Sequence, residues 1–142
     1  MRIAFLDTIE WDYSPETPFC KPLGGTQSAV CYLMMAMQKQ GHEIFLINNT
    51  KIRDCIRNIY CIPFSNNLGD LRDIFRKINV DFLIIISAPS LAKSLRPILS
   101  KATKIYLWTG HAHNQPALNG LEIDEVKNSL FVATHPSHGT TR

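Results

Sequence analysis

The chain has 142 residues and a mass of 16.1 kDa, a length that predicts a single domain. Hydrophobic residues make up 45% of the chain and charged residues 19%, which are proportions of a globular protein and exclude a disordered one. The net charge of +3 is too small to indicate nucleic-acid binding.

No apolar run approaches the ~20 residues of a membrane-spanning helix. The N-terminal apolar run ends at Asp7, too early for the core of a signal peptide. We therefore expect a soluble, cytoplasmic chain with reduced cysteines. The four cysteines form no C-x-x-C pair, so the sequence indicates neither a zinc knuckle nor a thioredoxin-like site.

The first half of the chain begins with a short apolar strand, predicted at Arg2–Leu6 and of the kind buried on both faces of a sheet. A long polar connection with three prolines follows, from Thr8 to Gly25. Apolar residues then recur at helical spacing from Ala29 to Met37, and Gly41 ends this predicted helix. The second strand is predicted at Glu43–Ile47.

The second half continues the alternation of strands and helices. The predicted elements are strand 58–63, helix 68–78, strand 82–86, helix 89–100, strand 104–108, helix 117–127 and strand 130–133. Asn66 or Asn67 is expected to cap the first of these helices, and Pro97 to bend or shorten the second.

Six short strands with intervening helices predict a Rossmann-like, doubly wound, mostly parallel six-stranded sheet with right-handed crossovers. This domain is expected to span residues 1–133. The tail, residues 134–142, has no apolar run that could close such a fold, and it is expected to be irregular, which a truncation would explain.

One candidate site is the segment Pro22–Gln27, directly before the first long helix. Paired glycines let backbone N–H groups approach a ligand closely, and the helix N-terminus behind them carries a partial positive charge. Gly24, Gly25, Thr26 and Gln27 therefore predict a site for a phosphate or another anion, with Thr26 capping the helix or donating its hydroxyl group. A glycine turn that only leads into the helix explains the same residues equally well.

Known nucleotide-binding loops do not fit this segment. The sequence contains no G-x-G-x-x-G and no Gly-Lys-Ser/Thr, and the second strand ends in Asn48 and Asn49 with no acid to hold a ribose. An ordinary NAD- or ATP-binding domain is therefore disfavoured.

A second candidate site is the loop Trp108–Pro116, which follows the fifth strand. It brings His111, His113 and Asn114 to the edge of the sheet where ligands bind in parallel folds. An imidazole can donate a proton to a developing charge or to a sugar hydroxyl near neutral pH. The spacing of the two histidines would suit zinc, but the sequence places no third ligand, so no metal site is predicted.

Trp11 lies in the long first connection, beside Glu10, Asp12 and Tyr13. These side chains could stack on, and hydrogen-bond to, a polar substrate such as a sugar. A surface loop with one anchored aromatic residue is an equally good interpretation.

The order of these segments is similar to that of the N-terminal domain of family 4 glycosyltransferases, which have the GT-B fold. The matching residues are Pro22, Gly24, Gly25, Thr26 and Gln27, then Gly41, His42 and Glu43, then Trp108 and His111. The resemblance covers residues 1 to about 133.

The resemblance implies a retaining transferase that moves a sugar from a nucleotide-sugar donor to a sugar or lipid-linked acceptor. It implies that the loop of Gly24 and Gly25 reaches the donor diphosphate. It also implies that His111, with His113 as the fallback, contacts the transferred sugar. No metal or other cofactor is required in that mechanism, because positive groups and amides stabilise the leaving diphosphate.

The family's second domain, which binds most of the nucleotide sugar, has no counterpart in this sequence, so we expect the chain alone to have little or no transferase turnover. After Ala133 the sequence also departs from the family pattern. Enzymes of this kind that use lipid acceptors lie at the inner face of the membrane. The cations Lys93, Arg96, Lys101 and Lys104 are compatible with such a contact.

Two other functions fit parts of the sequence. A stand-alone α/β module could bind a sugar or a phosphorylated ligand without catalysis. A flavodoxin-like or response-regulator-like interaction domain is disfavoured, because Asp7 is followed by Thr8 and Ile9 where such domains have a second acid.

Overall fold

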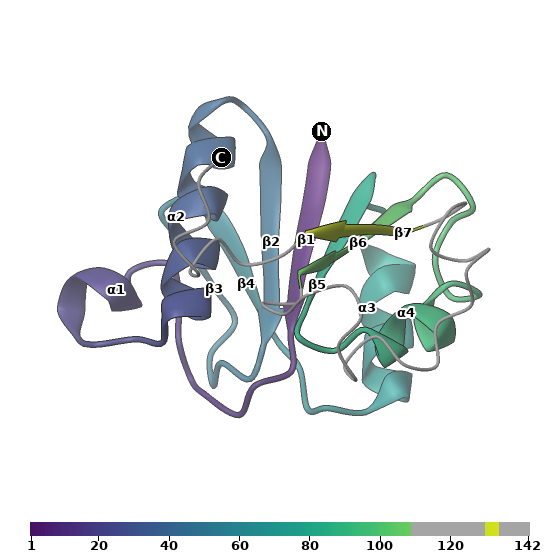
Figure 1. Cartoon of the computed structure of the whole chain (residues 1–142), viewed down its shortest axis with the longest axis horizontal. Helices are drawn as coiled ribbons and strands as arrows, with labels where there is room; N and C mark the ends of the chain where they lie inside the picture. Colours follow the sequence, from purple (N-terminus) through teal and green to yellow (C-terminus); the bar gives the residue numbers. More distant parts are fainter. Residues whose placement is uncertain (109–129, 134–142) are drawn as a thin grey trace.

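The computed structural model describes residues 1–108 in full and residues 130–133 as backbone. It has an α/β architecture with a seven-stranded sheet in the order β3-β4-β2-β1-β5-β6-β7 (Figure 1). The strands are β1 (Arg2–Asp7), β2 (Glu43–Asn48), β3 (Asp54–Ile56), β4 (Ile59–Pro63), β5 (Phe82–Ile86), β6 (Lys104–Trp108) and β7 (Leu130–Ala133). The described helices are α1 (Thr17–Cys20), α2 (Gly25–Lys39), α3 (Leu68–Lys77) and α4 (Ser90–Leu95).

The six predicted strands all form, and each pairs in parallel with its neighbours among them. The prediction of six strands is one too few, because β3 adds an antiparallel edge strand beside β4. The two-residue turn between β3 and β4 has φ values of 53° at Arg57 and 62° at Asn58. Positive φ at both positions is typical of a type I′ hairpin turn, which glycine usually signals in a sequence. Neither residue is glycine, so the hairpin left no clear sequence signal.

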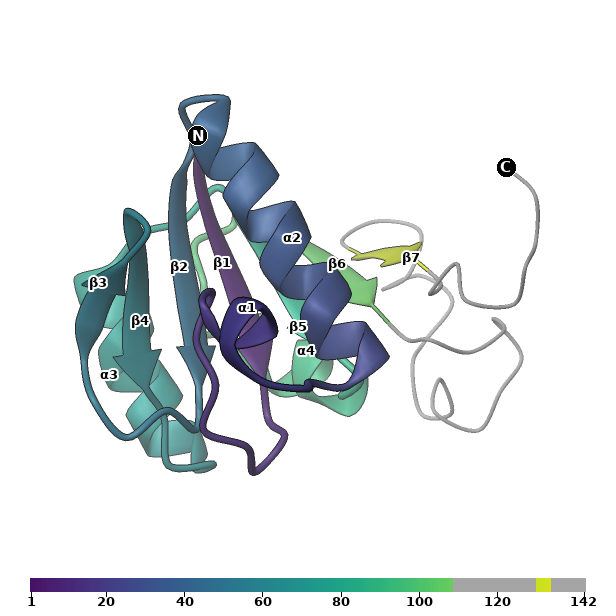
Figure 2. The same cartoon turned by 90° about the vertical axis from the view of Figure 1, so that its left-hand side faces the viewer.

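Each face of the sheet carries its own apolar cluster. Ile3 and Phe5 of β1 point to the side covered by α2 and pack with its Val30 and Met34. Ala4 and Leu6 point to the opposite side, where α3 and α4 contribute buried residues that include Leu71, Phe75 and Leu95. Figure 2 shows α2 in front of the sheet and α3 behind it. Because both faces of β1 are covered, side chains that point to either face are buried, which explains why the sequence of this strand is continuously apolar.

The strand order changes direction at β1, which has β2 on one side and β5 on the other. This arrangement is compatible with a Rossmann-like fold. In the register, Asp7 at the end of β1 is opposite Ile86, and Ile86 is opposite Trp108 at the end of β6. The connections that follow β1, β5 and β6 therefore leave from the same edge of the sheet.

The predicted end of α2 is confirmed in detail, whereas α4 ends before its predicted limit. At the end of α2, Gly41 has φ +96°, and the N–H groups of Gly41 and His42 donate to the carbonyls of Gln38 and Met37 at 3.0 and 3.2 Å. This is the Schellman arrangement that glycine favours. α4 ends at Leu95, two residues before Pro97 and earlier than the predicted 100.

The predicted helix 117–127 and the tail 134–142 lie outside the described residues. Within the described part of the chain, no helix is both long enough and apolar enough to cross a membrane.

The start of α3 supplies a test of local stability. The Asn67 side chain accepts a hydrogen bond from the Asp70 N–H at 2.7 Å, which identifies Asn67, and not Asn66, as the cap. We expect Asn67→Ala to lower the free energy of unfolding by about 1 kcal/mol, measured by urea denaturation. Arg72→Ala, on an exposed position of the same helix, should change it by less than about 0.5 kcal/mol. Equal effects of the two substitutions would contradict the assigned cap.

Two buried thiols predict how stability depends on alkaline pH. Burial raises the pKa of Cys31 to about 12 and that of Cys61 to about 11, from ordinary values of 9.0. Above pH 9 the unfolded chain therefore loses protons that the folded chain retains, and stability should fall between about pH 9 and pH 12. In urea denaturation at several pH values, Cys31→Ala should flatten this decline. Substitution of the exposed thiol, Cys20→Ala, should leave the decline as it is, and a decline unchanged in Cys31→Ala would refute the explanation.

Candidate functional site

The carboxyl end of β1 carries a buried carboxyl group. Asp7 is 1% exposed, and its Oδ2 accepts hydrogen bonds from the Tyr13 hydroxyl at 2.6 Å and from the Gln27 side-chain amide at 3.1 Å. Its Oδ1 accepts from the Ile9 N–H at 3.1 Å. Three donors satisfy a group that would otherwise be costly to bury, and they connect β1, the following loop and α2 at one point.

The Tyr13 hydroxyl is the hydrogen-bond donor to Asp7 in this network. Burial, followed by the effect of Asp7, raises the pKa of Tyr13 well above its ordinary value of 10.0. The hydroxyl therefore keeps its proton at neutral pH, and it acts here as a structural donor.

Two asparagines at the end of β2 hold the same loop. The Asn48 side chain is fully buried and donates to the Tyr13 carbonyl at 2.9 Å. The Asn49 side chain donates to the Ile9 carbonyl at 2.8 Å and reaches Asn66 Oδ1 at 3.2 Å. From the sequence, Asn48 and Asn49 were notable only because neither is an acid that could bind a ribose. In the structure, their side chains hold the loop that follows β1.

These contacts fix the loop at Ile9 and at Tyr13. The three residues between them, Glu10, Trp11 and Asp12, are exposed and line a cavity of about 680 Å³. Lys21, Gly24 and Lys51 also line this cavity. This cavity is lined by both charged and apolar groups.

The paired glycines differ in their surroundings. A Cβ on Gly24 would lie 2.9 Å from the Trp11 ring and 2.9 Å from Gln27 Oε1, so Gly24 allows the indole to pack against the backbone. A Cβ on Gly25 would meet nothing within 4 Å, and Gly25 is exposed. Gly24 is therefore needed for packing, whereas the space beside Gly25 is open to a ligand.

The N-terminus of α2 has no side-chain cap and no acidic residue in its first turn. Gly24 occupies the cap position, so Thr26 lies inside the first turn with its side chain half-buried. Of the two roles predicted for Thr26, capping the helix is therefore wrong, and donation of its hydroxyl group to a ligand stays a prediction. Gln27 is 6% exposed and donates to Asp7. Its predicted contact with a substrate remains a prediction.

Of the predicted site residues, the structure brings together Trp11, Gly24, Gly25, Thr26 and Gln27. His111, His113 and Asn114 lie outside the described residues, and their roles stay predictions. The sequence reasoning did not identify Asp7, Asn49, Lys21 or Lys51 as parts of this region. For Asp7 a signal existed, because an acid that ends a buried parallel strand lies at the ligand-binding edge of the sheet.

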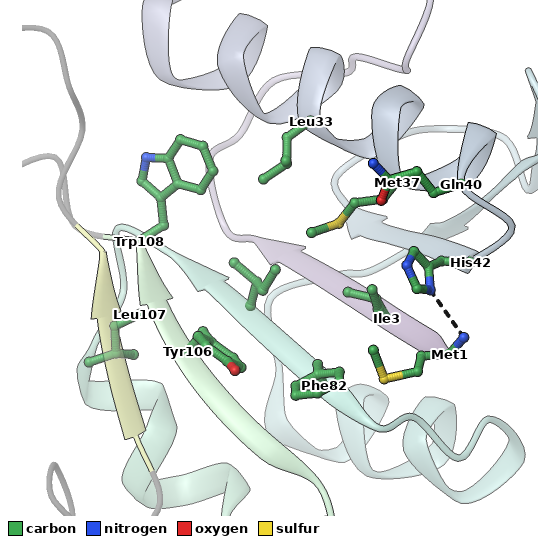
Figure 3. Close-up of a pocket in the computed structure, with 11 residues that line it drawn as sticks. Met1, Ile3, Leu33, Met37, Gln40, His42, Phe82, Tyr106, Leu107 and Trp108 are labelled. Carbon is green, nitrogen blue, oxygen red and sulfur yellow. Dashed lines mark hydrogen bonds between the residues drawn. The ribbon is translucent and has the colours of Figure 1, made fainter. Parts of the chain in front are cut away.

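A second cavity, of about 380 Å³, lies on the sheet face beside α2 and is almost entirely apolar. Figure 3 shows Leu33 and Met37 of α2 on one side and Ile3 and Phe82 of the sheet on the other. His42 lies at one end, where its Nδ1 is 3.1 Å from the N-terminal nitrogen. The lining of this cavity is mostly apolar, whereas several charged side chains line the cavity beside Trp11, which is therefore the better candidate site for a polar substrate.

Neither protein-family models nor curated proteins match this sequence. Any functional conclusion must therefore come from the residues and their geometry. Among the described residues, no group of three or more His, Cys, Asp or Glu side chains has an arrangement that could hold a metal ion.

The Asp7 network yields a direct test. Asp7→Asn replaces one acceptor oxygen with a donor group that faces the Tyr13 hydroxyl or the Ile9 N–H. We expect the free energy of unfolding to fall by about 1.5–3 kcal/mol, the range for hydrogen bonds to charged groups.

The matched control for this substitution is Asp12→Asn. Asp12 is exposed and accepts one hydrogen bond of 3.3 Å from the Lys51 N–H, so its effect should be below about 0.5 kcal/mol. Urea denaturation followed by circular dichroism measures both. Similar stability of the two variants would show that the Asp7 contacts do not hold the loop.

Proposed function

We propose that the chain is the acceptor-side, Rossmann-like, doubly wound domain of a retaining GT-B glycosyltransferase of family 4. In this proposal it takes part in moving a sugar from a nucleotide-sugar donor to a sugar or lipid-linked acceptor. The observation that carries the proposal is the open space at Gly25, on an uncapped helix N-terminus beside the cavity of Trp11. A helix N-terminus favours an anion, and the cavity offers room for a sugar.

The two sides of the site would have different tasks. The amides at Gly25 and Thr26 would stabilise the negative charge of the donor diphosphate as it leaves, so that no metal or other cofactor is needed. Trp11 would support the acceptor sugar, and the buried side chain of Gln27 would keep the turn in place through Asp7.

The sheet register supports a role for the loop that follows β6. Asp7, Ile86 and Trp108 are aligned across β1, β5 and β6. Strands in a sheet are about 4.8 Å apart, so the loop after Trp108 starts about 10 Å from the end of β1. His111 follows three residues later and would contact the transferred sugar, with His113 and Asn114 as further substrate contacts.

The proposal requires a partner for the nucleotide half of the donor, a C-terminal domain of the GT-B type. It places the protein in the cytoplasm, with peripheral membrane contact if the acceptor is a lipid. Arg96 would contribute little to such a contact, because its guanidinium donates to the backbone carbonyls of Thr103 and Ser100.

The alternative is a non-catalytic α/β module that binds a sugar or a phosphorylated ligand in the same cavity. Incubation of the chain with labelled nucleotide sugars, in the presence and absence of a GT-B C-terminal domain, separates the two functions. Transfer only in the presence of that domain supports the enzyme. Ligand binding without transfer in either case supports the module.

The Gly25 site is tested with inorganic pyrophosphate and a set of nucleoside diphosphates, titrated into the ¹⁵N-labelled chain and followed by NMR. Gly25→Val should fold normally, since its side chain enters open space, but it should block the approach of the diphosphate. We expect binding to weaken at least about tenfold, the equivalent of one or two lost charge-assisted hydrogen bonds.

The matched control is Gly69→Val. Gly69 lies in the first turn of α3, and a Cβ there would make an ordinary contact of 3.4 Å with Asn67 Oδ1. Pyrophosphate binding should be unchanged in this variant. Unchanged binding in Gly25→Val as well would remove the diphosphate from this helix and, with it, the main support for the proposal.

A further inference from the structure

The cavity beside Trp11 contains two lysines that have no carboxylate partner among residues 1–108. Lys21 and Lys51 both line it and both are exposed. The ion pairs among the described residues are Arg2–Glu43 and Arg57–Glu16, and neither includes these lysines. Two ammonium groups in one cavity, with no ion-pair partner in the described part of the chain, can contact an anionic group of a ligand.

The same cavity contains two acids that the lysines do not neutralise through direct contact. Glu10 and Asp12 flank Trp11 in the loop. Asp12 Oδ1 accepts the Lys51 backbone N–H at 3.3 Å, which ties the segment after β2 to the loop. Carboxylate oxygens are acceptors only, so their natural ligand partners are hydroxyl groups.

Trp11 supplies an apolar surface between these charges. Its ring packs against Gly24, and the residue is nevertheless 45% exposed. An exposed indole held by the backbone offers a rigid face to the C–H side of a sugar ring. An apolar face, hydroxyl acceptors and cations thus occur together in one cavity.

We infer that this cavity binds a carbohydrate that carries an oxyanion, either the carboxylate of an acidic sugar or the phosphate of a sugar phosphate. The ring lies on Trp11, the hydroxyls donate to Glu10 and Asp12, and the oxyanion contacts Lys21 and Lys51. This inference rests on the proposed function, for which it names the class of acceptor.

The experiment uses the ¹⁵N-labelled 142-residue chain and three probes: glucose, glucuronate and glucose 1-phosphate. The Trp11 indole N–H signal reports binding, and the backbone N–H signal of Gly69 in α3, which does not line the cavity, serves as an internal reference. We expect at least one of the two anions to bind at least about threefold more tightly than glucose, and the anion that does so identifies the carboxylate or the phosphate as the recognised group.

Substitution of the lysines tests the charge contact. Lys21→Gln and Lys51→Gln should each weaken anion binding by about twofold to fivefold and leave glucose binding unchanged. Lys39→Gln is the matched control, because Lys39 is exposed at the far end of α2 and does not line the cavity. Trp11→Ala should weaken the binding of all three probes.

Pyrophosphate separates this inference from the proposed function. Gly25→Val should weaken pyrophosphate and leave the anionic sugar bound, whereas the lysine variants should do the reverse. A double variant, Lys21→Gln with Lys51→Gln, completes the test. The inference is overturned if glucose and both anions bind equally well, or if the double variant binds the anion as tightly as the unmodified chain. It is also overturned if the double variant loses pyrophosphate and the anionic sugar to the same extent. Transfer to a neutral acceptor alone would overturn it and leave the glycosyltransferase proposal intact.

Discussion

The hydrogen bonds to Asp7 determine how the candidate site is built. A carboxyl group buried at the end of the central strand must find donors, and it finds them in the loop, in Tyr13 and in α2. Because Tyr13 and Gln27 donate to the same Asp7 oxygen, neither can move away without leaving that oxygen short of one donor. The position of the loop relative to the helix N-terminus is thereby tied to the sheet.

This arrangement assigns separate tasks to residues that look equivalent in the sequence. Gly24 and Gly25 are neighbours, yet only Gly24 is required by the packing of Trp11 and Gln27. Gly25 has no such packing requirement, and its missing side chain leaves the helix start accessible. A pair of glycines can therefore serve the fold at one position and a ligand at the next.

The sequence was sufficient for the parallel strands, for the end of α2 and for the start of α3, because these follow from local patterns: continuous apolar runs, Gly41 after α2, and an asparagine before α3. It was insufficient for α1, which lies within the predicted connection Thr8–Gly25. It was insufficient for β3, whose turn has Arg57 and Asn58 in conformations that glycine usually signals. It was also insufficient for the contacts of Asp7 with Gln27 and of Asn49 with Ile9, which join residues 20 and 40 positions apart. Such pairs are fixed by the tertiary arrangement and leave no periodic signal.

The spacing of the loop contacts explains how an exposed tryptophan can be presented in one orientation. Ile9 is held by Asp7 and Asn49, and Tyr13 is held by Asp7 and Asn48, so the loop is fixed two residues before and two residues after Trp11. A span of three residues between fixed points has little conformational freedom left to lose. Its side chains therefore meet a ligand at a lower entropic cost than those of a free loop of the same sequence, which is the general advantage of preorganisation. The buried polar groups contribute to binding without touching the ligand, since they reduce the conformational entropy that the exposed groups lose when they contact it.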